Sequence, residues 1–246
     1  MTKGQHMSTI LVTGGTGSLG RPTVEHLRAA GHTVRVLSRR AGQGLVSGDL
    51  TTGQGLDAAV AGVDTVVHLA TGQGRKDVVQ TQNLLDVTPL PTHIVYMSIA
   101  GADRIPLAYY RYKVAAERLV EEREAYTILR ATQFHSLLDR LFSVKGPFIL
   151  APSITLQPIA VQDVAVRLTE LAGGPAAGRV PDIGGPERQP VTDLARAWKA
   201  AHGSRRLVLP VRAPGKLFRA FDDGAALVDG PSYGHITFAD YLGGKS

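Results

Sequence analysis

The chain has 246 residues, of which 43% are hydrophobic and 20% charged, and this balance excludes a largely disordered protein. It contains no cysteine (Cys 0), which excludes disulfides, zinc–thiolate sites and thiol nucleophiles and favours a cytoplasmic location. Lysine and arginine exceed aspartate and glutamate by 27 − 21 = 6. These charges are spread along the chain without a basic block, so we expect no nucleic-acid partner.

The N-terminus shows no export or membrane signal. Residues 1–7 (MTKGQHM) resemble a leader added by cloning, and we exclude them from the fold. No run approaches the roughly 20 apolar residues that a membrane helix needs. We expect residues 8–246 to form a single domain, with a cofactor-binding core over 8–135 and a substrate-binding cap over roughly 136–246.

Strands and helices alternate through the first half of the chain. Short apolar runs predict strands at 8–13, 33–37, 45–49, 64–70, 93–98 and 127–131. Helical spacing of apolar residues predicts helices at 21–30, 55–61, 76–87 and 107–124. This alternation is typical of an α/β fold, a doubly wound parallel sheet with helices on both faces.

The pattern loosens after residue 132. Helices are expected at 134–142, 162–171 and 191–202, and strand-like segments at 148–150, 179–183 and 207–211. We interpret this region as a small cap on the main sheet.

A glycine-rich turn links the first strand to the first helix. Gly14, Gly17 and Gly20 recur at every third residue of TGGTGSLG. Such glycines allow a tight turn, close approach of a pyrophosphate and close packing of helix on strand, while the helix N-terminus attracts phosphate. We therefore predict a dinucleotide site that also includes Thr16, Ser18 and Leu19.

The end of the second strand indicates which dinucleotide binds. Ser38-Arg39-Arg40 stands where an NAD-preferring protein usually has an acidic residue. Arginine suits a phosphate, so NADPH is expected over NADH, although both arginines could be solvated surface residues. Asp49 and Leu50 follow the third strand and are assigned to the adenine, with turn formation as the alternative for Asp49.

A possible catalytic group follows the fifth strand. Tyr109 and Lys113 are four residues apart and share a helix face, and Ser98 ends a strand at the edge where parallel sheets bind ligands. A tyrosine can protonate a substrate oxygen, a neighbouring ammonium can lower the pKa of that tyrosine, and a serine can hold the substrate. Tyr109, Tyr110 and Tyr112 are clustered, so any one of them could instead have only a packing role.

These motifs resemble the short-chain dehydrogenase/reductase superfamily, and the overall pattern is similar to its atypical NmrA-like branch. The resemblance covers residues 8–135 and implies a Rossmann fold, NAD(P)H and reduction of a carbonyl, quinone or conjugated double bond. It makes Tyr109 the acid/base, gives Lys113 the nicotinamide ribose and assigns substrate orientation to Ser98. Family members often carry an Asn-Val pair where this chain has Asp77-Val78.

The remaining candidates lie at other strand ends. Ala70 and Thr132 are assigned to the cofactor, and Gln133, Phe134 and His135 to the substrate, with Thr132 as a helix cap as the alternative. No histidine has metal-ligand spacing, so we expect no metal.

The sequence thus favours a bacterial, NADPH-dependent reductase of a small apolar ketone, quinone or enone. A non-catalytic NAD(P) sensor and a redox-neutral isomerase or cyclase remain open, as does a homo-oligomer.

Overall fold

The computed structural model describes residues 7–72 and 74–244, so the predicted leader lies outside the described residues apart from Met7. The chain divides into two compact units. The first comprises residues up to Ser98 together with Ala108–Leu129 and Ala165–Pro181, and the second comprises Ile99–Leu107, Arg130–Val164 and Asp182–Ser246. The predicted boundary was a single one near residue 135, whereas the chain passes between the two units several times.

The first unit is built on a seven-stranded sheet of order β3-β2-β1-β4-β5-β6-β9. The strands are β1 (Thr9–Thr13), β2 (Thr33–Ser38), β3 (Leu45–Ser47), β4 (Thr65–His68), β5 (His93–Ile99), β6 (Tyr126–Ala131) and β9 (Gly178–Arg179). The pairs β1–β2, β1–β4, β2–β3, β4–β5 and β6–β9 are parallel. The predicted Rossmann-type α/β fold is therefore confirmed.

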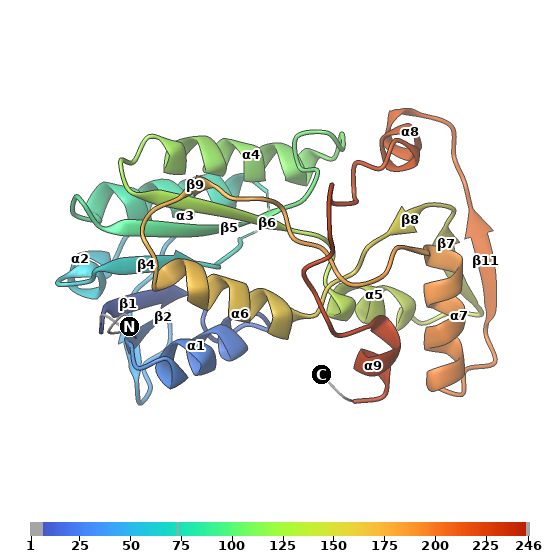
Figure 1. Ribbon diagram of the computed structural model, residues 1–246, viewed down its shortest axis with the longest axis horizontal. Helices are drawn as coiled ribbons and strands as arrows, with labels where there is room; N and C mark the ends of the chain where they lie inside the picture. Colours follow the sequence, from blue (N-terminus) through green and yellow to red (C-terminus); the bar gives the residue numbers. More distant parts are fainter. Residues whose placement is uncertain (1–6, 73, 245–246) are drawn as a thin grey trace. The chain divides into compact units, whose positions relative to one another are not determined.

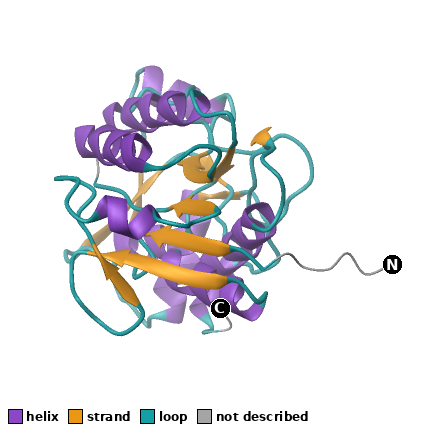
Figure 2. Ribbon diagram, turned by 90° about the vertical axis from the view of Figure 1, so that its left-hand side faces the viewer, coloured by secondary structure: helices purple, strands orange, loops and turns teal. Residues whose placement is uncertain are grey.

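Helices cover both faces of this sheet (Figure 1, Figure 2). They are α1 (Gly20–Ala29), α2 (Leu56–Val60), α3 (Arg75–Val87), α4 (Ala108–Glu121) and α6 (Val161–Ala172). Figure 1 shows α3 and α4 side by side on one face and α1 with α6 on the other. Because both faces are covered, all four residues of β4 (TVVH) are buried.

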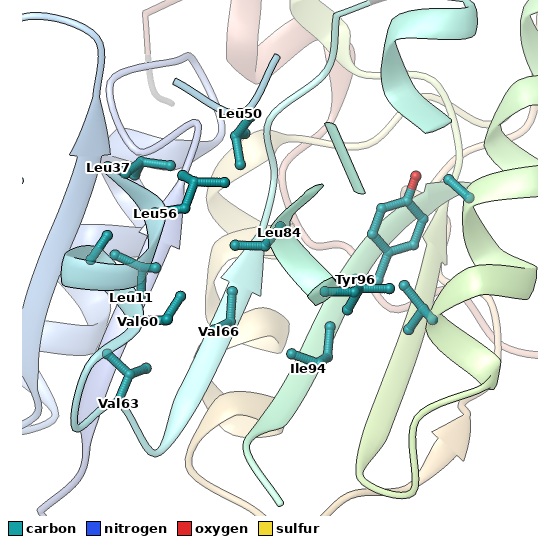
Figure 3. Packing of buried hydrophobic residues seen from close by; sticks show 14 of the residues in the cluster. Leu11, Leu37, Leu50, Leu56, Val60, Val63, Val66, Leu84, Ile94 and Tyr96 are labelled. Atoms are coloured by element: carbon teal, nitrogen blue, oxygen red, sulfur yellow. The ribbon is translucent and has the colours of Figure 1, made fainter. Parts of the chain in front are cut away.

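Apolar side chains from these layers form one core beneath α3 and α4. Figure 3 shows Leu11 of β1, Leu56 of α2, Leu84 of α3 and Ile94 of β5 meeting there, and all four are fully buried. This burial fixes the strand register, because a slip of one residue would turn these side chains to the opposite face.

The register aligns the strand ends that matter for function. Thr13 of β1 pairs with Leu37 of β2 and with His68 of β4, and His68 pairs in turn with Tyr96 of β5. The segments that follow these residues therefore leave the sheet at the same carboxyl edge, where parallel α/β sheets bind ligands.

The second unit contains short elements. They are α5 (His135–Phe142), β7 (Phe148–Pro152), β8 (Thr155–Leu156), β10 (Gln189–Pro190), α7 (Val191–Ala201), β11 (Leu207–Val211), α8 (Lys216–Asp222) and α9 (Phe238–Leu242). β7 pairs with β11 in parallel, and β8 with β10 antiparallel. Trp198 ties α7 to α5, since its indole Nε1 donates to Asp139 Oδ1 at 2.6 Å.

The predicted strands and helices of the first unit are present, with ends shifted by up to three residues. The predicted strand at 179–183 shrinks to β9, which belongs to the first unit, and a single bridge between Ala131 and Ile183 in the second. The helices α8 and α9 were not predicted. Within the described residues no helix has both the length and the apolar character to cross a membrane.

Candidate active site

The glycine-rich turn is packed so tightly that side chains are excluded. Gly14 has a φ of 70°, and a Cβ there would lie 2.7 Å from the backbone nitrogen of Ala70. A Cβ on Gly20 would lie 2.1 Å from the carbonyl oxygen of Gly14. The N–H of Gly17 donates to that same carbonyl at 3.0 Å, which closes the turn. Two of the three glycines are thus required by backbone contacts inside the protein.

This turn leads into the N-terminus of α1. Leu19 stands at the N-cap position and makes no side-chain capping hydrogen bond, and the first turn of α1 contains no acidic residue. Thr16 and Ser18 are exposed. The positive end of the helix dipole is therefore not neutralised by a local carboxylate, as an anion-binding helix end requires.

The turn after β2 lies next to the glycine-rich turn, because Leu37 pairs with Thr13. Ser38 accepts a hydrogen bond from the N–H of Arg40 through its Oγ at 3.0 Å. Arg39 and Arg40 are exposed. Two guanidinium groups are therefore carried beside the predicted phosphate site.

The two residues assigned to adenine have structural partners. Asp49 Oδ1 accepts the N–H of Thr51 at 2.7 Å, the turn contact that was the alternative interpretation. Leu50 is buried and belongs to the core beneath α3. Their assignment to adenine stays a prediction.

A chain of hydrogen bonds connects the loop after β4 to α3. The N–H of Ala70 donates to Thr13 Oγ1 at 3.3 Å, and that hydroxyl lies 2.6 Å from His68 Nδ1. His68 Nε2 lies 3.1 Å from Thr81 Oγ1, which donates to the carbonyl oxygen of Asp77 at 2.8 Å. Because the Thr81 hydroxyl proton is donated to Asp77, Thr81 must accept a hydrogen bond from the Nε2–H of His68. The unprotonated Nδ1 of His68 then accepts a hydrogen bond from the Thr13 hydroxyl.

The buried ring of His68 is neutral. Burial, with a smaller contribution from the charge of Lys113, lowers the pKa of His68 to about 3. Its two ring nitrogens are both occupied by threonines. His68 is thus a structural residue that connects the ends of β1 and β4 to α3.

Tyr109, the second residue of α4, contacts a buried acid through a threonine. Its hydroxyl lies 3.2 Å from Thr71 Oγ1, and Thr71 donates to Asp77 Oδ1 at 2.9 Å. The N–H of Gly72 donates to the same Oδ1 at 2.6 Å. Burial raises the pKa of Tyr109, and the charges of Asp77 and Tyr110 add to the increase, whereas a hydrogen bond donated by Thr71 to the phenolate would lower it.

Lys113 lies one turn further along α4 and turns toward β5. Its Nζ donates to the hydroxyl of Tyr96 at 2.9 Å and to the carbonyl oxygen of Met97 at 3.1 Å. Only 5% of Lys113 is exposed, and this burial lowers its pKa, whereas Asp77 and Glu117 favour the charged form.

The three residues predicted to act together are not directly linked. Within residues 7–72 and 74–244, Ser98, Tyr109 and Lys113 make no hydrogen bond to one another, and the buried Oγ of Ser98 has no partner. The pKa of Tyr109 is raised, chiefly by burial, and the ammonium of Lys113 is hydrogen-bonded to Tyr96 and Met97, so the expected tuning of Tyr109 by Lys113 stays a prediction. Their catalytic roles stay predictions.

Thr71 was missed by the sequence analysis, and Asp77 was noted only as a departure from the family pattern. Thr71 follows β4 at the ligand edge, as Ala70 does, so its position in the sequence was a usable signal. Its contact with Tyr109 depends on the packing of α4, which sequence spacing alone does not give.

The segment predicted to contact substrate belongs to the second unit. Thr132 Oγ1 donates to the carbonyl oxygen of Gln157. The side-chain amide of Gln133 is buried and has no partner among the described residues. His135 Nε2 lies 3.1 Å from the carbonyl oxygen of Pro158, and its buried Nδ1 has no partner in the same part of the chain. Burial lowers the pKa of His135 to about 4. Phe134 is the N-cap residue of α5, the position that the sequence allowed for Thr132.

The described residues offer two further observations about ligands. No group of three or more His, Cys, Asp or Glu side chains in this part of the chain could hold a metal ion. A pocket of about 370 Å³ in the second unit is lined by Arg104, Lys216 and Arg219 together with Asp223. Three basic side chains and one acidic side chain therefore line this pocket.

Comparison with known proteins gives a partial family match and many structural matches. The NAD dependent epimerase/dehydratase family matches residues 10–87. A comparison with curated protein sequences gives no significant match.

Solved structures match over nearly the whole chain. A nucleoside-diphosphate-sugar epimerase from Staphylococcus aureus is 17% identical with a TM-score of 0.77, covering 95% of this chain and 99% of that one. An NADPH-dependent quinone oxidoreductase from Escherichia coli, complexed with NADPH, is 16% identical with a TM-score of 0.78, covering 96% and 99%. The UDP-glucose 4-epimerase of Thermus thermophilus, complexed with NAD, is 18% identical with a TM-score of 0.71, covering 97% and 100%. The family match and the shared fold confirm the resemblance predicted from the sequence, to NAD(P)-binding proteins of the short-chain dehydrogenase/reductase type.

Proposed function

We propose that this chain is an NADPH-dependent oxidoreductase that reduces a small, apolar ketone, quinone or enone, with Tyr109 as the proton donor. The observation that carries the proposal is the position of Tyr109. Its hydroxyl is held by Thr71, in the segment that leaves β4 at the ligand edge, and its surroundings keep it protonated at neutral pH. The similarity to an NADPH-dependent quinone oxidoreductase supports the same reaction class.

The residues at the sheet edge suit a dinucleotide. The turn at Gly14 and Gly20 excludes side chains, and the α1 N-terminus has neither a side-chain cap nor an acid in its first turn. These features would hold a pyrophosphate through backbone N–H groups. Arg39 and Arg40 would hold the additional phosphate of NADPH, since no carboxylate at the end of β2 is present to bind ribose hydroxyls.

The chain's own groups have separable roles. A nicotinamide cofactor supplies the hydride when it is bound. Tyr109 breaks its O–H bond and protonates the substrate oxygen. Ser98, whose buried hydroxyl has no partner within residues 7–72 and 74–244, would donate a hydrogen bond to that oxygen and orient it. Lys113 holds Tyr96 and the carbonyl of Met97, which fixes the end of β5 directly before Ser98.

A redox-neutral epimerase is the second candidate, because the matching family model describes epimerases and dehydratases. An epimerase returns the hydride to its product and consumes no cofactor. A stoichiometric loss of NADPH absorbance with substrate therefore favours the reductase, whereas conversion of substrate in the presence of the oxidised cofactor, with no net change in NADPH absorbance, favours the epimerase.

Substitution of Tyr109 by Phe tests the proton-donor role. Removing a general acid typically costs about 100- to 10,000-fold in rate, so Tyr109→Phe should lose nearly all turnover. Its affinity for NADPH, measured by the fluorescence of the bound cofactor, should be unchanged. Tyr112→Phe, a change on the exposed side of the same helix, is the matched control and should keep wild-type turnover. Normal turnover in Tyr109→Phe would refute the assignment.

A further inference from the structure

The hydroxyl of Tyr109 is connected to a carboxylate through one side chain. Thr71 Oγ1 lies 2.9 Å from Asp77 Oδ1, 3.2 Å from Asp77 Oδ2 and 3.2 Å from the Tyr109 hydroxyl. A threonine hydroxyl has a single proton to donate. With that proton directed to Asp77, Thr71 can only accept from Tyr109, so the phenol must carry its own proton.

Asp77 is held in a fixed position for this contact. Only 2% of the residue is exposed, and it lies in the first turn of α3. The N–H of Gly72 donates to its Oδ1 at 2.6 Å, so the carboxylate also fixes the backbone next to Thr71. A charge-assisted hydrogen bond of this kind is stronger than a neutral one, which favours Asp77 over Tyr109 in the competition for the Thr71 proton.

Other ionisable groups surround the pair. Lys113 on α4 and Tyr96 on β5 both interact electrostatically with Asp77, and Tyr110 on α4 interacts with Tyr109. The ammonium of Lys113 is directed to Tyr96 and Met97, not to the Tyr109 phenol. Asp77 is thus a charged group connected to Tyr109 through a single hydrogen-bonded side chain.

We propose that Asp77, acting through Thr71, is a positioning residue that holds the Tyr109 hydroxyl in its protonated, proton-donating form. The carboxylate draws the Thr71 proton away from the phenol, so Thr71 does not donate a hydrogen bond that would stabilise the phenolate. This arrangement suits a reductase, which needs a proton donor, and not a reaction that begins with a phenolate base. The inference rests on the proposed function for its catalytic meaning, but the hydrogen-bonding claim can be tested without any substrate.

The experiment is a pH titration of Tyr109 in the full chain by NMR, with ¹³C in the tyrosine ζ position and with Tyr109→Phe used to assign the signal. Asp77→Asn keeps the size of the side chain but removes its charge, which leaves Thr71 free to donate to the phenolate. The pKa of Tyr109 should fall by at least about half a unit, which is about a threefold change in the proton-binding constant. The alkaline limit of kcat should move to lower pH by a similar amount.

Asp86→Asn is the matched control, because Asp86 lies on the same helix, is exposed and also accepts a side-chain hydrogen bond. It should leave the Tyr109 titration unchanged. In a Thr71→Val background, Asp77→Asn should have less than half of its effect, since the connecting hydroxyl is missing. An equal effect in both backgrounds would show that Asp77 acts through space and would overturn the inference.

Thr71→Val alone keeps the test decisive if Asp77→Asn does not fold. Valine offers the phenol no acceptor, so the neutral form of Tyr109 loses its hydrogen bond and the pKa of Tyr109 should fall. A rise would show that Thr71 donates to the phenolate in the wild type and would overturn the inference. A titration that responds as expected in a protein without reductase activity would support the inference while refuting the proposed function. Reductase activity with a Tyr109 titration unaffected by Asp77→Asn would refute the inference alone.

Discussion

Replacement of Gly20 by alanine tests whether helix propensity or close packing determines stability at this position. Gly20 is the first residue of α1, and alanine in a helix is normally more stable than glycine by about 0.5–1 kcal/mol. A Cβ at this position would lie 2.1 Å from the carbonyl oxygen of Gly14 and 2.5 Å from the Cα of Gly15. Both neighbours are backbone atoms, so the helix and the glycine-rich turn would have to move apart.

The magnitude follows from the cost of overpacking, about 1–3 kcal/mol for one added methyl group in a tight site. In a protein of this size each kcal/mol shifts Tm by about 2–4 °C, so Gly20→Ala should lower Tm by between about 2 and 12 °C. Because the turn itself moves, NADPH affinity should fall by at least about tenfold, or about 1.4 kcal/mol.

Thermal unfolding followed by circular dichroism, and NADPH titration followed by fluorescence, measure the two effects. Gly62→Ala is the control, because Gly62 has a φ of 65° but open space around it. That variant should lose about 1 kcal/mol through backbone strain and keep wild-type affinity for NADPH. A Gly20→Ala variant with unchanged or higher Tm and unchanged affinity would refute the reasoning from close contact.

Two other predictions concern the cofactor and pH. Arg39→Ala should weaken binding of NADPH much more than binding of NADH in fluorescence titrations, and equal losses would contradict the assignment of Arg39 to the additional phosphate. His68 has a pKa of about 3 in the fold against 6.5 normally, so below pH 6.5 the unfolded chain binds a proton that the folded chain does not. Stability should therefore fall with pH from about 6.5 to about 3, by up to about 4–5 kcal/mol from this residue. Urea unfolding at pH 7 and pH 4 should show a smaller loss for His68→Asn than for the wild type, and equal losses would show that His68 is not responsible.

Periodicity predicted the first unit because its elements bury apolar faces regularly. β4 is buried on both sides, and its TVVH sequence is a continuous apolar run that ends in a histidine. In the second unit, α9 has only five residues and no apolar repeat, yet Thr237 and Asp240 form a capping box that the sequence contained. That signal was available and was not used, whereas α8 begins after Gly215 without a side-chain cap and gave no comparable signal.

The site was predictable at the level of strand ends but not of side-chain direction. Parallel pairing brings the ends of β1, β2, β4 and β5 to one edge, so the candidates Gly14, Ser38, Ala70 and Ser98 could be found from the sequence. Spacing of four residues places Tyr109 and Lys113 on one helix face but fixes only their Cβ atoms. The buried ammonium of Lys113 needs hydrogen-bond acceptors and finds them on β5, at Tyr96 and Met97. Which acceptors lie within its reach depends on how α4 packs on the sheet.

The two polar networks of the site meet at one residue of α3. The carbonyl oxygen of Asp77 accepts a hydrogen bond from the Thr81 hydroxyl. From Thr81 the network runs through His68 to Thr13, directly before the glycine-rich turn. The carboxylate of Asp77 holds Thr71 and, through it, Tyr109. The backbone and the side chain of Asp77 therefore orient the predicted cofactor site and the predicted proton donor from the same helical turn. A movement of this turn would displace both at once, and the burial of Asp77 with its hydrogen bonds to Thr71 and Gly72 opposes such a movement.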